Sequence, residues 1–124
     1  MVDNLRFLVE QLKAVSHPLR LRVLALLAVG EYCVCQVAEV LQVPQSSVSE
    51  ALKELRRAGF VRERKEGRWV FVSTTPASEA SPLLQGLLAE VAPLPETLQD
   101  RTQAEAVKAL ALPIPCPASK VQHG

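Results

Sequence analysis

Residues 34–73 read VCQVAEVLQVPQSSVSEALKELRRAGFVRERKEGRWVFVS, and this stretch decides the fold. Apolar residues recur at helical spacing on both sides of a tight break at Val43-Pro44-Gln45. We therefore predict a short helix over 34–42 and a longer helix from the break to Ala58, with Gly59 as the residue that ends it. Two helices joined by a tight turn form a helix-turn-helix.

A β-hairpin is predicted directly after the second of these helices. Residues 60–64 and 69–73 are rich in β-branched and aromatic side chains. Lys65-Glu66-Gly67-Arg68 lies between them and is typical of a hairpin turn. The order helix, tight turn, helix and hairpin predicts a mainly α fold with a β-hairpin.

Four further helices are predicted around this motif. On the N-terminal side, amphipathic spacing indicates a helix over 3–15, and Ser16 is the expected cap of a helix that stops at Gly30. On the C-terminal side, a fifth helix is expected between a linker at 74–82 and a break at Pro93, and a more polar sixth helix over about 95–111.

Length and composition predict one soluble domain. The chain has 124 residues, of which 48% are hydrophobic and only 4% aromatic, so aliphatic side chains must fill the core. We expect this domain to span 1–112 and a Pro-rich tail carrying Cys116 to span 113–124. The sequence has neither an apolar run long enough for a bilayer nor the pattern of a signal peptide, which predicts a cytoplasmic protein without a membrane partner.

The net charge of +1 hides a strongly uneven distribution. Residues 53–68 hold seven basic and three acidic side chains, a net charge of +4, whereas 1–52 carry −1 and 69–124 carry −2. A basic helix and hairpin on one surface fit DNA, because the helix can enter the major groove while the hairpin touches phosphates. The alternative is a solvated face laced with ion pairs; the order of the elements favours DNA.

The chain also resembles the ArsR/SmtB family of metal-responsive regulators over about residues 5–73. The matching segments are SHPLRLRVL at 16–24, EYCVCQVA at 31–38, QSSVS followed by LKELRRAGFV within 45–61, and RKEGRWV at 64–70; they resemble the family's second helix, metal box, recognition helix and wing. The resemblance implies a winged helix-turn-helix homodimer, in which the hairpin is the wing and the first and fifth helices form the dimer interface. It also implies a repressor that leaves its operator DNA when a metal binds.

The predicted DNA contacts lie on the fourth helix and the hairpin. One departure from the family is Glu50-Ala51, where many relatives carry a basic or histidine pair. Glu50 can accept from a cytosine amino group or simply form ion pairs in solvent. We expect contacts to bases or nearby phosphates from Gln45, Ser46, Ser47 and Ser49, and contacts to phosphates from Lys53, Arg56, Arg57, Arg64, Lys65 and Arg68.

Cys33 and Cys35 lie at the predicted start of the third helix, where the helix dipole favours thiolates, the form that binds soft metals. Residues two apart do not share a helix face, so both sulfurs reach one ion only if the helix start is irregular or distorts. The arsenic-sensing branch often has a third cysteine at the position of Ala38. We therefore predict an As(III) or Sb(III) site of Cys33, Cys35 and Cys116, with Cys116 from either protomer; Cd(II) and Pb(II) also accept three thiolates.

Other functions for the cysteines remain open. The thiols could instead sense oxidation, although a Cys-x-Cys disulfide closes a strained ring, or the protein could buffer metals. Free cysteines are also commonly buried as small hydrophobic residues. An arsenate reductase needs an arginine six residues after its cysteine, but those positions hold Glu39, Leu41 and Gln122, so we predict no enzyme and no organic cofactor. The zinc site that some relatives carry on the fifth helix is absent, because 79–92 contain neither histidine nor aspartate.

Overall fold

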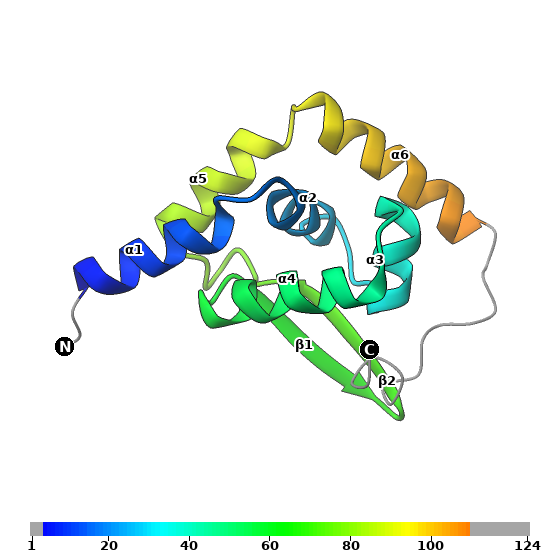
Figure 1. Cartoon of the computed structure of the whole chain (residues 1–124), viewed down its shortest axis with the longest axis horizontal. Helices are drawn as coiled ribbons and strands as arrows, with labels where there is room; N and C mark the ends of the chain where they lie inside the picture. The colour runs from blue at the N-terminus through cyan, green and yellow to red at the C-terminus, as the bar shows by residue number, and fades with distance from the viewer. Residues whose placement is uncertain (1–3, 110–124) are drawn as a thin grey trace.

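The computed structural model describes residues 4–109 (Figure 1). Its elements are, in order, α1 (Asn4–Val15), α2 (Pro18–Leu27), α3 (Val34–Leu41), α4 (Gln45–Arg57), β1 (Val61–Glu66), β2 (Trp69–Thr74), α5 (Pro82–Val91) and α6 (Pro95–Ala109). The predicted fold class, mainly α with a two-stranded hairpin, is confirmed. The end of the predicted domain at 112 and the tail with Cys116 lie outside the described residues.

Helix α2 forms the centre of the core and lies between the other helices in Figure 1. Its sequence is apolar on nearly every side, and such a helix is stable only when it is buried on every side. It contacts α1, α3, α4, α5, α6 and β2. Its fully buried side chains include Val23, Leu24, Leu26 and Leu27.

Local conformation at the helix ends explains where the chain turns. Gln42 ends α3 in the left-handed region at φ 58°, and the extended backbone of Pro44 then starts α4. The expected cap of α2 is wrong, because the side chain of His17, not that of Ser16, accepts a hydrogen bond from the Leu19 amide. Helix α2 also ends earlier than predicted, at Leu27.

The hairpin turn is tighter than the sequence suggested. Glu66 pairs with Trp69, so the turn consists of two residues and begins with Gly67 at φ 63°. A glycine at the first position of a two-residue hairpin adopts this conformation without strain. Inward-facing Val70 and Val72 of β2 are buried, which seats the hairpin on the helical core.

The apolar faces of α1 and α5 differ in exposure. The large apolar side chains of α1 are 40–72% exposed; they are Leu5, Phe7, Leu8, Val9 and Leu12. On α5, by contrast, Leu84 and Val91 are buried, and the other leucines are half-buried against the core. The exposed leucines therefore lie on α1, whereas the core covers those of α5 in whole or in part. Within residues 4–109, no helix has the length and apolar character needed to cross a bilayer.

Candidate nucleic-acid interface and metal centre

The first turns of α4 present polar side chains to solvent. Gln45 and Ser46 are exposed and Ser47 is half-buried. Ser49 differs, because its hydroxyl oxygen is buried and has no hydrogen-bond partner in the described part of the chain. Three of the four predicted polar contacts are thus accessible from outside in this conformation.

A crevice of about 330 Å³ lies beside these residues, where the start of α2 meets the start of α4. His17 and Arg20 line it opposite Ser46, Ser47 and Glu50. Sequence reasoning assigned no surface role to His17 or Arg20. The sequence offered little indication of such a role, because only the packing of α2 against α4 brings His17 and Arg20 to the face that carries the predicted base contacts.

All seven cations of residues 53–68 are exposed, and four of them already have carboxylate partners. Arg57 pairs with Glu54 on the same helix at 3.6 Å. The other pairs join separate elements: Arg56 with Glu63, Arg62 with Glu79, and Arg64 with Glu31 and Glu66. Within residues 4–109, no ion pair is formed by Lys53, Lys65 or Arg68. The surface formed by residues 53–68 therefore carries both unpaired cations, as expected for DNA binding, and several exposed ion pairs, as expected for a solvated face.

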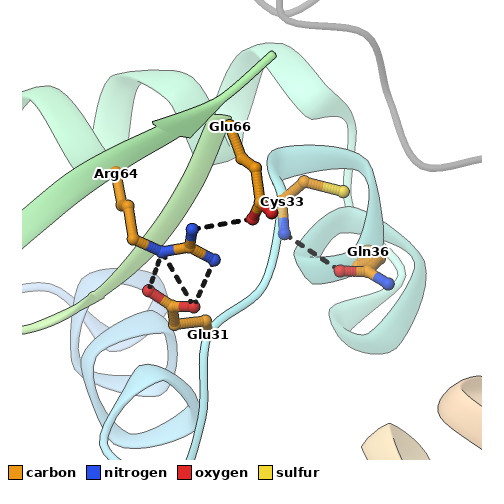
Figure 2. Close-up of polar contacts among 5 residues, drawn as sticks. All are labelled: Glu31, Cys33, Gln36, Arg64 and Glu66. Carbon is orange, nitrogen blue, oxygen red and sulfur yellow. Dashed lines mark hydrogen bonds and ion pairs between the residues drawn. The ribbon is translucent and has the colours of Figure 1, made fainter. Parts of the chain in front are cut away.

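Arg64 has the most extensive of these contacts (Figure 2). Its Nε lies 3.0 Å from Glu31 Oε2, its Nη2 lies 2.8 Å from Glu31 Oε1, and its Nη1 lies 2.8 Å from Glu66 Oε1. The guanidinium also lies 5.0 Å from the centre of the Phe71 ring. The hydrogen bonds from Arg64 lower the pKa of Glu31, and the bonds to Glu31 and Glu66 raise the pKa of Arg64.

Cys33 is the residue that caps the start of α3. Its backbone is extended, at φ −90° and ψ 165°, and its amide donates a 3.0 Å hydrogen bond to Gln36 Oε1. The thiol is buried, whereas Cys35 is half-buried one residue inside the helix. Because Cys33 stands just outside the helix, the spacing of helical faces does not separate the two side chains.

The sulfur atoms of Cys33 and Cys35 consequently lie 3.7 Å apart. Two thiolates bound to one tetrahedral ion at about 2.3 Å each would be separated by about 3.8 Å. Because Cys35 is disulfide-bonded in this structure and Cys33 is free, the spacing suits two ligands of a soft metal only once Cys35 is reduced. No group of three metal-binding side chains occurs within residues 4–109, and Cys116 lies outside that range.

The residue between Glu31 and Cys33 connects this pair to the wing. Tyr32 forms an antiparallel bridge with Val72, with N–O distances of 3.1 and 2.8 Å. Lys108 Nζ lies 4.4 Å from the centre of the Tyr32 ring. The loop that begins with Glu31 is thus fixed by β2 on one side and contacted by α6 on the other. Sequence reasoning missed both residues, because their partners are far away in the chain.

A family model described as "Bacterial regulatory protein, arsR family" matches residues 17–63. An uncharacterized HTH-type transcriptional regulator from Methanocaldococcus jannaschii is 46% identical over 63 residues, which cover 50% of this chain and 71% of that relative. The chain belongs to the arsR family. Another relative, the arsenic resistance transcriptional regulator ArsR1 of Pseudomonas putida, is 35% identical over 65 residues, which are 52% of this chain and 51% of ArsR1.

Solved structures agree with membership of the arsR family. HlyU from Vibrio cholerae superimposes with a TM-score of 0.61 and 30% identity, over 74% of this chain and 95% of HlyU. The resemblance to ArsR/SmtB regulators is therefore confirmed, as is the winged helix-turn-helix that it implied. Since the relatives are transcriptional regulators, the prediction that the chain is not an enzyme is also confirmed.

Proposed function

We propose that this arsR-family chain is a repressor that binds operator DNA as a homodimer and leaves it when As(III) or Sb(III) binds cysteine thiolates. The observation that carries the proposal is the 3.7 Å separation of the Cys33 and Cys35 sulfur atoms. These two residues lie at the start of α3, the first helix of the helix-turn-helix. A ligand that bridges the sulfurs therefore acts directly on the helix that packs against α4. The name of the Pseudomonas relative supports the choice of effector.

In the proposed complex, α4 lies in the major groove and the hairpin follows the phosphate backbone. Gln45, Ser46 and Ser47 contact bases or nearby phosphates, and Ser49 is left out because its hydroxyl oxygen is buried. The cations without intramolecular partners, Lys53, Lys65 and Arg68, bind phosphates directly. Arg56, Arg57 and Arg64 join them by exchanging a carboxylate for a phosphate, and exposed ion pairs are weak enough to allow this exchange.

The proposed effector site takes two thiolates from the start of α3 and a third from Cys116 of either protomer. Thiolates are soft ligands, and the amide groups at a helix start favour their negative charge. Three thiolates complete the pyramidal coordination of As(III) or Sb(III). Cd(II) and Pb(II) are the alternative effectors, since they accept the same ligands.

The proposed homodimer buries the exposed apolar face of α1. Leu5 is 72% exposed and Leu12 is 47% exposed, and a continuous apolar face of this kind marks an interaction site in a soluble protein. A second copy covers it by symmetry, with α5 completing the interface. Two copies also place two recognition helices on the two halves of an operator.

The test is a fluorescence anisotropy titration of the reduced protein on its own upstream DNA. As(III), Sb(III), Cd(II), Pb(II) and Zn(II) are added to the wild type and to the variants Cys33→Ser and Cys116→Ser. We expect As(III) or Sb(III) to release the wild type and to have no effect on Cys33→Ser. Retention of release in Cys116→Ser would remove the tail cysteine from the site. Intact DNA binding with no release by any of these ions would refute the proposal.

Thiol oxidation is the second candidate signal, and the state of Cys35 favours it, because Cys35 is disulfide-bonded in this structure while Cys33 is free. A disulfide between Cys33 and Cys35 themselves would close a strained ring. Peroxide would then release the DNA while arsenite would not. The two signals are separated by adding each of them to the reduced protein–DNA complex.

A further inference from the structure

We propose that Glu31 competes with DNA phosphates for Arg64, and that this competition couples the thiol pair to the wing. The coupling rests on the proposed function, whereas the competition for Arg64 does not. Three observations support the proposal: the occupancy of the Arg64 guanidinium, the position of Glu31 beside the thiol pair, and the rigid connection between that loop and β2.

Each guanidinium nitrogen of Arg64 already donates to a carboxylate in this conformation, which leaves one N–H on each Nη. Glu31 accepts from Nε and Nη2, and Glu66 accepts from Nη1 (Figure 2). The group of one arginine and two carboxylates carries a net charge of −1, which repels a phosphate. Arg64 can form a two-pronged contact with a phosphate through Nε and Nη2 only after the phosphate has replaced Glu31. Because the pair is exposed, this exchange costs little and is reversible.

Glu31 lies two residues before Cys33 in one short connection. Between them, Tyr32 is hydrogen-bonded to Val72 through both its amide and its carbonyl. The connection therefore cannot shift at Cys33 without disturbing either this bridge or the Glu31–Arg64 pair. The conformation in which Cys35 is disulfide-bonded and its sulfur lies 3.7 Å from that of Cys33 is also the conformation that occupies Arg64.

The direction of the coupling follows from this shared conformation. A ligand that bridges the two sulfurs stabilises the state in which Glu31 holds Arg64, and DNA stabilises the state in which Arg64 is released. By linkage, each ligand weakens the binding of the other. Glu31 thus changes the response to the effector without being one of its ligands.

The test compares Glu31→Gln with Glu39→Gln in the full-length reduced protein. Glu39 is an exposed carboxylate on α3 and forms no ion pair in the described part of the chain, so its replacement removes the same charge without freeing Arg64. Without an effector, we expect Glu31→Gln to bind upstream DNA about threefold more tightly than Glu39→Gln does. We expect the loss of DNA affinity caused by arsenite to shrink by about the same factor.

The same two variants are then compared in a protein that also carries Arg64→Gln. In that background, Glu31→Gln should have no effect beyond that of Glu39→Gln, because the competition needs Arg64. An equal tightening with and without Arg64 would overturn the proposal, as would identical DNA affinities of Glu31→Gln and Glu39→Gln. If Glu31→Gln binds more tightly but no ion releases the wild type, the proposed effector response fails and the competition for Arg64 stands.

Discussion

Arg22 of α2 and Asp100 of α6 form a two-pronged ion pair, with Nε 3.0 Å from Oδ2 and Nη2 2.9 Å from Oδ1. Asp100 is 7% exposed, and its hydrogen bonds raise the pKa of Arg22. Arg101, the next residue, donates from Nη2 to the carbonyl of Ala25 at 3.2 Å. These contacts attach the polar helix α6 to the central helix.

Replacing Asp100 with alanine should destabilise the fold. The change leaves the partly buried Arg22 without its partner, and we expect the free energy of unfolding to fall by about 2 kcal/mol. Urea unfolding followed by circular dichroism measures the change. Gln99→Ala, one residue earlier on an exposed position of α6, is the control and should remain near the wild type. Equal stabilities of the two variants would contradict an anchoring role for the pair.

The salt dependence of DNA binding should distinguish unpaired from paired cations. Lys65→Gln or Arg68→Gln removes a cation that has no carboxylate partner within residues 4–109, so each should lower the slope of log K against log salt by about 0.9. Arg62 pairs with Glu79 and is outside the proposed contact set, so Arg62→Gln should leave the slope unchanged. Anisotropy titrations at several salt concentrations give the slopes. Slopes of Lys65→Gln and Arg68→Gln equal to that of the wild type would exclude these two wing cations from phosphate contact.

A charge on α1 should break the proposed homodimer without unfolding the chain. Leu8 is 41% exposed, so Leu8→Glu removes little from the core, but it places a carboxylate within the apolar face. We expect sedimentation equilibrium to show a monomer with unchanged helical content. Leu98→Glu on α6, where Leu98 is 53% exposed, is the matched control and should leave the dimer intact. A wild type that sediments as a monomer would already rule out the dimer.

Gln36 should stabilise the start of α3 through its acceptor oxygen. It accepts from the Cys33 amide at 3.0 Å, so Gln36→Ala should lower the stability by about 1 kcal/mol. Gln36→Glu keeps an acceptor at this place and should remain close to the wild type. Thermal unfolding of the three proteins gives the comparison. A loss in Gln36→Glu as large as in Gln36→Ala would show that the hydrogen bond is not responsible.

Local signals in the sequence were sufficient for most of the fold. Gly59 and Gly67 have positive φ values, which glycine adopts without strain, so they mark the end of α4 and the hairpin turn. Pro44 marks the turn between α3 and α4, because its ring fixes φ. The cap at α2 was assigned to the wrong neighbour, because the His17 imidazole supplies the acceptor that was expected from the Ser16 hydroxyl.

The candidate site was predictable in its residue types but not in its pairings. Arg64 and Glu31 are 33 residues apart, and only the packing of the hairpin against the loop before α3 brings them together. Residues two apart within a helix do not share a face, but this rule does not apply to the Cys33–Cys35 contact, because Cys33 lies just before the first turn of α3. Likewise, the burial of the Ser49 hydroxyl is caused by the elements that pack against α4, and the position of Ser49 in the sequence did not reveal it.

The bridge between Tyr32 and Val72 has a consequence for how the protein behaves at high concentration. β2 has β1 on one side and Tyr32 on the other, so the middle of this strand offers no open edge to another chain. The remaining edge belongs to β1, whose residues 62–66 are all charged and exposed. Charged edges resist strand addition. The wing is therefore protected against edge-to-edge aggregation by charged side chains, among them Arg64 and Lys65 of the proposed phosphate contacts.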